Sequence, residues 1–263
     1  MAENIHVAEQ GLQWTLSDIK IMTWRGLLRY VRLPQLLVFS TIQPVLFLLL
    51  FTYVFGGAIQ TPGSNYINFL VPGILVQVVV FGSVQTGVGL AEDLSKGMIN
   101  RFRSLPMASS AVLYGRTLAD LIRNIFVMIL MLLVAFVIGF RPEGNIFAIT
   151  LALLLIALFG FAFSWISATI GLSAGTSEAA QIAGFIWIFP LVFASSIFVP
   201  IETMPSWLQA FANVSPITVT VNAVRALILH TPVGDNLWQS LLWIIGLLVD
   251  FSLLAVLKYR QLK

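Results

Sequence analysis

The sequence predicts an all-α membrane protein with six transmembrane helices, and its composition is the first reason. Of the 263 residues, 59% are hydrophobic and only 10% are charged, and the mean hydropathy is +0.95. A soluble domain is about half apolar and about a quarter charged, so lipid must solvate most of this surface. The chain has no cysteine and therefore no disulfide framework.

Six long apolar runs are the second reason. A hydrocarbon core of about 30 Å needs roughly 20 apolar residues in a helix. The runs that approach or exceed this length cover residues 36–57, 67–91, 118–140, 146–170, 179–200 and 237–257. The first run begins near Leu36, so no secretory signal peptide is expected. We divide the chain into a cytoplasmic tail with an interfacial helix, 1–35, and a transmembrane domain, 36–263.

The distribution of positive charge is the third reason, and it predicts the orientation. Cytoplasmic loops of membrane proteins carry an excess of Lys and Arg. With the N-terminus inside, most of the 14 Lys and Arg residues fall in cytoplasmic segments. They are Lys20, Arg25, Arg29, Arg32, Lys96, Arg101, Arg103, Arg116, Lys258, Arg260 and Lys263. Both termini are therefore expected in the cytoplasm, and the chain in a bacterial inner membrane.

The stretch WTLSDIKIMTWRGLLRYVRLP precedes the first apolar run and is amphipathic. Arg25, Arg29 and Arg32 fall on one helical face. Trp24 and Val31 fall on another. This pattern predicts a basic helix that lies in the headgroup plane of the membrane. The alternative is a solvated basic tail.

The stretch EDLSKGMINRFRSLP, between the second and third runs, is unusually charged. Asp93 or Ser95 is expected to cap a short helix that continues to about Arg103, where Pro106 prevents further extension. Such a helix, parallel to the membrane and rich in basic residues, suits a groove on a cytoplasmic partner. The alternative is an ordinary positively charged loop.

The segment before the last run is amphipathic and interrupted by prolines. Its apolar part, 216–230, reaches only about 22 Å as a helix and should not span. We expect two short helices in the outer leaflet, surrounded by protein or water.

Ionisable residues within the runs are expensive in lipid and are often functional. Asp120 and Arg123 lie three residues apart near the inner end of the third run. They either pair with each other or transmit motion from the loop. Asp250 lies roughly 12 Å deeper than Lys258. It either faces a cavity or subunit interface, or makes a hydrogen bond between packed helices.

Aromatic residues recur at helical spacing in the first and fifth runs. These stripes either pack or face lipid, or they form an aromatic wall for an apolar substrate. The candidates for a translocation path or subunit interface are Gln43, Phe47, Phe51, Phe189, Phe193 and Asp250.

Catalytic motifs give little support to an enzyme. The sequence contains no G-x-x-x-x-G-K-[ST] loop for ATP phosphates, and no Cys/His metal motif. The stretch GLSAG, 171–175, matches G-x-S-x-G, but it ends an apolar helix instead of forming a strand–turn–helix elbow. Its small residues at a spacing of four are explained by close helix packing. We therefore expect no catalytic, cofactor or metal site on this chain, and no nucleic-acid partner.

Three stretches carry a family resemblance: QPVLFLLLFTYVFGGAI (43–59), GVGLAEDLSKGMINRFRSLPMASSAVLYGRTLADLIRN (87–124) and FVPIETMPSWLQAFANVSPITVTVNAVRAL (198–227). With the six runs they cover nearly the whole chain. The chain resembles the ABC-2 type permeases, and among them the subunits of daunorubicin/doxorubicin-resistance-type exporters.

The resemblance implies a division of labour. The chain would be half of a two-subunit path, as a homodimer or with a related permease, and two separate ATP-binding cassette subunits would bind ATP and Mg²⁺. Arg25, Arg29 and Arg32 would lie on a connecting helix, and 198–227 would supply the short outer helices. The ATPase-coupling residues, at or beside a coupling helix at 93–103, would be Glu92, Asp93, Lys96, Arg101 and Arg103.

The function expected from these observations is export of hydrophobic or amphiphilic substrates, such as drugs, lipids or lipid-linked molecules, across the cytoplasmic membrane. A passive channel is the alternative, but it should expose a repeating polar stripe, which is not evident. An intramembrane enzyme is disfavoured because a nucleophile with its base is missing.

Overall fold

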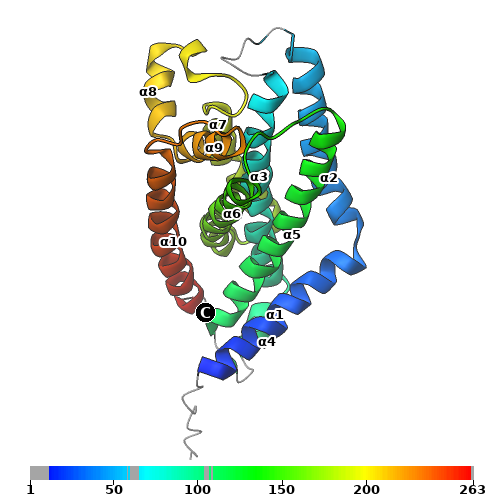
Figure 1. Cartoon of the computed structure of the whole chain (residues 1–263). Helices are drawn as coiled ribbons and strands as arrows, with labels where there is room; N and C mark the ends of the chain where they lie inside the picture. The colour runs from blue at the N-terminus through cyan, green and yellow to red at the C-terminus, as the bar shows by residue number, and fades with distance from the viewer. Residues whose placement is uncertain (1–11, 58, 60–64, 104–106, 108, 262–263) are drawn as a thin grey trace, which may run out of the picture.

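The computed structural model describes residues 12–57, 59, 65–103, 107 and 109–261, and these residues form a helical bundle without strands (Figure 1). Its elements are α1 (Leu12–Arg32), α2 (Gln35–Leu50), a π-helical segment η1 (Phe51–Phe55), α3 (Tyr66–Ser95), α4 (Met98–Arg103), α5 (Ser109–Val137), α6 (Ile146–Ala174), α7 (Ser177–Phe193), the 3₁₀ turn η2 (Ile201–Thr203), α8 (Ser206–Val214), α9 (Pro216–Ile228) and α10 (Asn236–Gln261). The predicted all-α membrane fold is confirmed.

Among the described residues, five helices are long and apolar enough to cross a membrane: α2 with η1, α3, α5, α6 and α10. The bent pair α8–α9, with 73° between its helices, counts as a broken span or a re-entrant segment. This pair corresponds to the two short helices predicted before the last span. Helix α1 and the last turn of α10 lie at the same end of the bundle, together with α4 (Figure 1).

The fifth predicted run, 179–200, is a shorter helix than expected. Helix α7 has 17 residues and ends at Phe193, which gives it a length of about 25 Å. Two serines follow, and both are satisfied locally. The hydroxyl of Ser195 donates to the carbonyl of Val192, and the hydroxyl of Ser196 donates to Asn222 on α9. These bonds turn the chain toward α9, so the helix ends at Phe193 and does not continue to residue 200.

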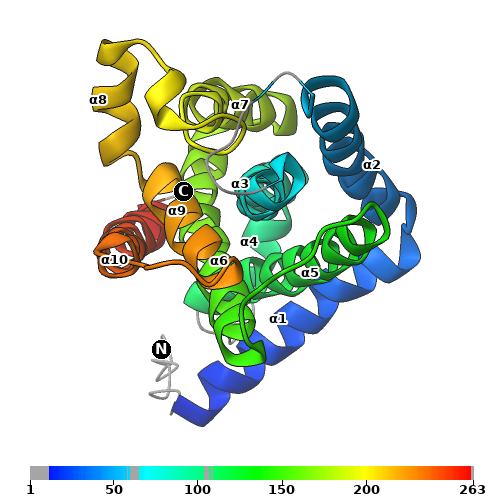
Figure 2. The ribbon, with the colours of Figure 1, turned by 45° about the horizontal axis from the view of Figure 1, so that its top comes forward.

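Helix α3 is the centre of the bundle, with α2, α5, α6 and α7 around it (Figure 2). Of the residues in its most apolar stretch, 78% are buried. It packs against α6 at backbone distance, because a Cβ on Gly87 would lie 2.3 Å from the Ser167 oxygen and a Cβ on Gly171 would lie 2.2 Å from the Gly87 oxygen. The small residues in the GLSAG stretch therefore serve helix packing at Gly171.

The outer faces of α2 and α10 are apolar. Val38, Ile42 and Leu46 are exposed on α2, and Val249 and Leu253 are exposed on α10. Their spacing of four residues places each set on one helical face. Such continuous apolar surface suits a lipid solvent or another transmembrane helix.

Candidate functional site

Helix α1 is amphipathic, as expected, and two of its basic residues, Arg25 and Arg29, contact the bundle, whereas Lys20 and Arg32 are exposed. Its outward side is apolar and carries Trp14, Ile21, Trp24 and Val31, all exposed. Tryptophan at such positions is typical of the membrane interface. The opposite side lies along α5, and its charged side chains reach the last turn of α3.

Two glycines set how closely α1 approaches α5. A Cβ on Gly26 would lie 2.6 Å from the Cβ of Ala119, and a Cβ on Gly115 would lie 2.4 Å from the Cβ of Met22. No larger residue fits at either position without moving one helix. This approach brings Tyr30, on the last turn of α1, to Asp120 on α5.

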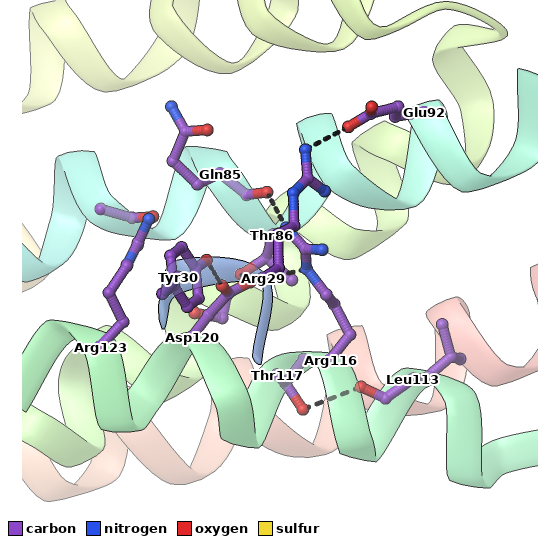
Figure 3. Close-up of polar contacts among 12 residues, drawn as sticks. Arg29, Tyr30, Gln85, Thr86, Glu92, Leu113, Arg116, Thr117, Asp120 and Arg123 are labelled. Atoms are coloured by element: carbon purple, nitrogen blue, oxygen red, sulfur yellow. Dashed lines mark hydrogen bonds and ion pairs between the residues drawn. The ribbon is translucent and has the colours of Figure 1, made fainter. Parts of the chain in front are cut away.

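Asp120 is fully buried and accepts hydrogen bonds from three helices (Figure 3). The hydroxyl of Tyr30 on α1 donates to one carboxylate oxygen. Thr86 on α3 donates to the other at 2.7 Å, and Arg116 on α5 forms an ion pair with it at 3.1 Å. A buried carboxylate is tolerated when a charge and several donors compensate its lost hydration.

The partner of Asp120 is Arg116, four residues earlier, and not Arg123 as the spacing suggested. Arg116 also donates to the carbonyl of Gln85 at 3.0 Å. Arg123 instead donates to the carbonyl of Gly82 at 2.6 Å. The i,i+4 geometry brings the two side chains onto one face as well as i,i+3 does, so spacing alone could not choose between them.

A second layer of ion pairs lies beside Asp120, toward α4. Arg29 of α1 contacts Glu92 of α3 at 2.5 Å, and Lys96 contacts the same carboxylate at 2.6 Å. Arg25 lies 3.7 Å from Asp93. Each of these partly exposed pairs is worth only about 0–1 kcal/mol, but together they fix α1 on the last turn of α3.

We name this connected set the α1 clamp. It consists of Arg25, Arg29, Tyr30, Thr86, Glu92, Asp93, Arg116 and Asp120. Burial, and secondly the charge of Asp120, raises the pKa of Tyr30 to about 12. The Tyr30 hydroxyl therefore stays protonated near neutral pH and remains a donor to the carboxylate.

Helix α4 is tied to the same clamp. The guanidinium of Arg25 lies 4.6 Å from the centroid of the Phe102 ring. Phe102 is buried in an apolar cluster with Leu90, Val112 and Trp165. Because α4 has only six residues, this anchor and the cation–π contact determine its position.

The short helix begins later than the sequence suggested. Helix α3 continues through Ser95, whose hydroxyl donates to the carbonyl of Glu92. Gly97, with a φ of +66°, then separates it from α4. The expected cap at Asp93 or Ser95 is therefore wrong, because both residues still belong to α3, and the left-handed conformation at Gly97 separates α3 from α4.

The predicted coupling residues divide into two groups. Glu92 and Asp93 contact α1 within the chain. Lys96 and Arg101 are exposed near α4. The side chain of Arg103 lies outside the described part of the structure. Arg32, at the end of α1, is also exposed.

The two aromatic stripes meet on a residue that the stripe spacing did not indicate. Phe198, which follows α7, stacks on Phe51 with centroids 4.4 Å apart and on Phe193 at 5.2 Å. Phe47 lies 6.5 Å from Phe193, and Phe189 lies 5.8 Å from Phe193. We name these five residues the aromatic wall.

Two other path candidates lie apart from this wall. Gln43 is exposed on α2, one turn before Phe47. Asp250 is exposed on α10, which stands across the bundle from α2, with α3 and α6 between them (Figure 2). The structure therefore groups the four predicted phenylalanines and leaves Asp250 on a separate surface, where its role stays a prediction.

The fold and the clamp define a class of protein. It is a multi-pass membrane protein in which two helices outside the spans, α1 and α4, are held to the spans by ion pairs, hydrogen bonds and a cation–π contact. The family model for ABC-2 type transporters matches residues 17–229, which include most of α1, the clamp and the aromatic wall. The chain belongs to the ABC-2 type transporter family.

Named relatives agree with this assignment. The daunorubicin resistance ABC transporter permease protein of Streptomyces coeruleorubidus is 35% identical over 90% of this chain and 84% of its own length. The probable doxorubicin resistance ABC transporter permease protein of Mycobacterium tuberculosis is 23% identical over 92% of this chain and 87% of its own length. The expected resemblance is therefore confirmed, and the chain is a transmembrane permease of this family.

Proposed function

We propose that this permease is the membrane subunit of an ATP-driven exporter in a bacterial cytoplasmic membrane, with both termini inside. Two separate ATP-binding cassette subunits bind ATP and Mg²⁺ and dock at α4 and the neighbouring end of α1. A second permease, identical or related, completes the translocation path. The cargo is a hydrophobic or amphiphilic molecule.

The observation that supports ATPase coupling is the α1 clamp. A displacement of α4 by the ATPase would move Arg25 of α1, because the Arg25 guanidinium contacts the Phe102 ring of α4. From α1 it reaches α3 through Glu92, and α5 through Asp120. Because α3 is the centre of the bundle, a displacement there shifts the packing of every helix around it.

The observation that supports an apolar cargo is the aromatic wall. Phe189 and Phe193 remain more than 40% exposed although they stack on neighbouring rings. Exposed flat rings along a membrane helix offer contact area to an apolar ring or an acyl chain. The relatives' names mention daunorubicin and doxorubicin resistance, and molecules of that kind suit such a surface.

Co-purification tests the docking proposal. An affinity-tagged chain, extracted from its native membranes, should retain an ATPase that carries a phosphate-binding loop. The variant Lys96→Glu with Arg101→Glu should lose this ATPase, since it reverses the exposed positive charge near α4. The matched control Arg141→Glu, in the loop after α5, should keep it.

Both variants must elute as folded protein for the comparison to hold. If the Lys96→Glu, Arg101→Glu variant retains as much ATPase as the control, then α4 is not the docking site.

A further inference from the structure

A polar cleft lies between α2, α3, α5 and α7, next to the α1 clamp. It consists of two adjoining cavities of about 80 Å³ and about 240 Å³. Both are lined by Ser40, Gln43, Gln85, Arg123 and Phe185. The larger cavity is also lined by Arg29, Tyr30 and Arg116 of the clamp.

Among the described residues that line the smaller cavity, three buried polar atoms have no hydrogen-bond partner. They are Nε of Arg123, Nδ2 of Asn124 and Oε1 of Gln77. The three side chains are only 4%, 2% and 3% exposed. Leaving buried polar groups unpaired is costly, so these three groups favour a polar partner at this cavity.

The cleft also carries an unbalanced positive charge. Arg123 donates to the Gly82 carbonyl and, at 2.8 Å, to Oδ1 of Asn124. No carboxylate of the described residues lies within 4.0 Å of its guanidinium. Asp120, one turn away, is already occupied by Arg116, as Figure 3 shows.

The cleft is continuous with the aromatic wall. Phe81 and Phe185 line its smaller cavity. Their ring centroids lie 5.2 Å and 5.5 Å from that of Phe189. A molecule whose polar end occupied the cleft could therefore place an apolar tail on Phe189 and the rings beyond it.

We propose that this cleft binds the anionic head group of an amphiphile, with its tail along the aromatic wall. Arg123 supplies the positive charge and a free N–H, Asn124 supplies a second N–H, and Gln77 accepts from a hydroxyl of the same head group. A phosphomonoester in its monoanionic form has both features, namely anionic oxygens and an O–H. This inference rests on the proposed export function for its physiological meaning, and it names the cargo class.

Titration calorimetry tests the site on the full chain in phosphatidylcholine nanodiscs without any ATPase. The probes are dodecyl phosphate, dodecyltrimethylammonium with the same tail, and inorganic phosphate, with empty nanodiscs as the reference for partitioning. We expect saturable binding of dodecyl phosphate and at least tenfold weaker binding of the other two. Because the ATPase is absent, failure here leaves the docking proposal untouched.

The decisive variant is Asn124→Asp, which places a carboxylate beside Arg123 and neutralises the cleft without changing its shape. It should preserve thermal stability and weaken dodecyl phosphate binding about tenfold or more. The hydrogen bond from the Asn124 amide to the phosphate is lost, and the new carboxylate repels the phosphate. The matched control Asn213→Asp, exposed on α8, should bind normally. Arg123→Lys should retain most binding, and Arg123→Gln should lose it.

Several results would overturn the proposal. If the two dodecyl probes partition equally, only the tail is recognised. If Asn124→Asp binds dodecyl phosphate as the wild type does, the cleft holds water only. If inorganic phosphate binds as tightly as dodecyl phosphate, the ligand is a free anion and not an amphiphile.

Discussion

Asp120 joins three helices at a single carboxylate. Its oxygens are shared by Tyr30 from α1, Thr86 from α3 and Arg116 from α5. A buried ion pair is retained when its geometry is good and its remaining lone pairs are satisfied. Both conditions hold here, so the residue specifies how α1 docks.

Replacing Asp120 with Asn should destabilise the chain by roughly 3 kcal/mol, since Arg116 is then buried without a counter-charge. Thermal unfolding in detergent measures the loss. The control is Asp250→Asn, because Asp250 is exposed and its replacement should leave stability unchanged or raise it. Equal effects of the two variants would show that the burial of Asp120 has no energetic consequence.

Tyr30 should titrate anomalously. Burial raises its pKa to about 12 from 10.0, so the folded state favours the neutral phenol. Its contribution to stability is therefore complete below pH 10 and is lost as the pH rises toward 12. The difference in ultraviolet absorbance between wild type and Tyr30→Phe isolates this one phenol. A midpoint near 10 would mean that α1 does not bury it.

At the scale of elements, α1 and α5 behave as one unit because glycines let them touch. A Cβ on Gly115 would meet the Met22 Cβ at 2.4 Å and its backbone carbon at 3.0 Å. Backbone cannot move aside as the end of a flexible side chain can. Helix α1 must therefore shift as a whole if this space is filled.

Gly115→Val should separate α1 from the last turn of α3. The chain contains no cysteine, so cysteines at Arg29 and Glu92 give a clean cross-linking pair for a short bifunctional thiol reagent. Cross-linking should be efficient with Gly115 present and fall several-fold with Val. Gly246→Val is the control, because a Cβ there meets nothing within 4 Å.

The helices that sequence predicts best are those whose pattern is local. The long spans and α1 follow from length, hydropathy and amphipathic spacing. Helix α7 was predicted too long, because Ser195 and Ser196 bind Val192 and Asn222, and only the second of these partners is remote in sequence. Hydropathy does not record such a turn.

The candidate site was only partly predictable from the sequence, because most of its contacts join residues that are remote in sequence. Charge in the loop drew attention to Glu92 and Asp93, but their partners on α1 are remote, with Arg29 63 residues from Glu92. Tyr30 and Thr86 gave no signal, since a lone Tyr or Thr beside a membrane span is ordinary. Phe198 lies outside both aromatic stripes and became visible only when α2 and α7 were placed together.

The whole molecule is expected to take one orientation in the membrane, because docking of a cytoplasmic ATPase at α4 needs α4 on the cytoplasmic side. Lys96, beside α4, should lie on the cytoplasmic side, and Asn145, at the start of α6, on the outer side. Single cysteines at these positions should react with a membrane-impermeant maleimide only from opposite sides of sealed vesicles. Labelling of position 96 from outside intact cells would invert the topology and remove the ATPase docking surface.

The molecule as a whole is a bundle with an apolar exterior, one clamp at the α4 end and an aromatic wall farther along. We infer that energy supplied at α4 moves the wall through the clamp. The ion pair between Arg29 and Glu92 is the accessible link in this path, because each residue is partly exposed. A charge exchange can therefore be made there without burying an unpaired charge.

The most direct test is the ratio of ATP-driven transport of a fluorescent lipid to ATP hydrolysis, in proteoliposomes that contain the chain and its co-purified ATPase. Arg29→Glu and Glu92→Arg should each lower this ratio several-fold while the ATPase stays bound. The double exchange re-forms the ion pair and should restore most of the ratio. The exposed Lys96, which contacts Glu92 in the wild type, can turn away from an arginine at position 92. A wild-type ratio in both single variants would contradict the claim that the clamp carries the motion.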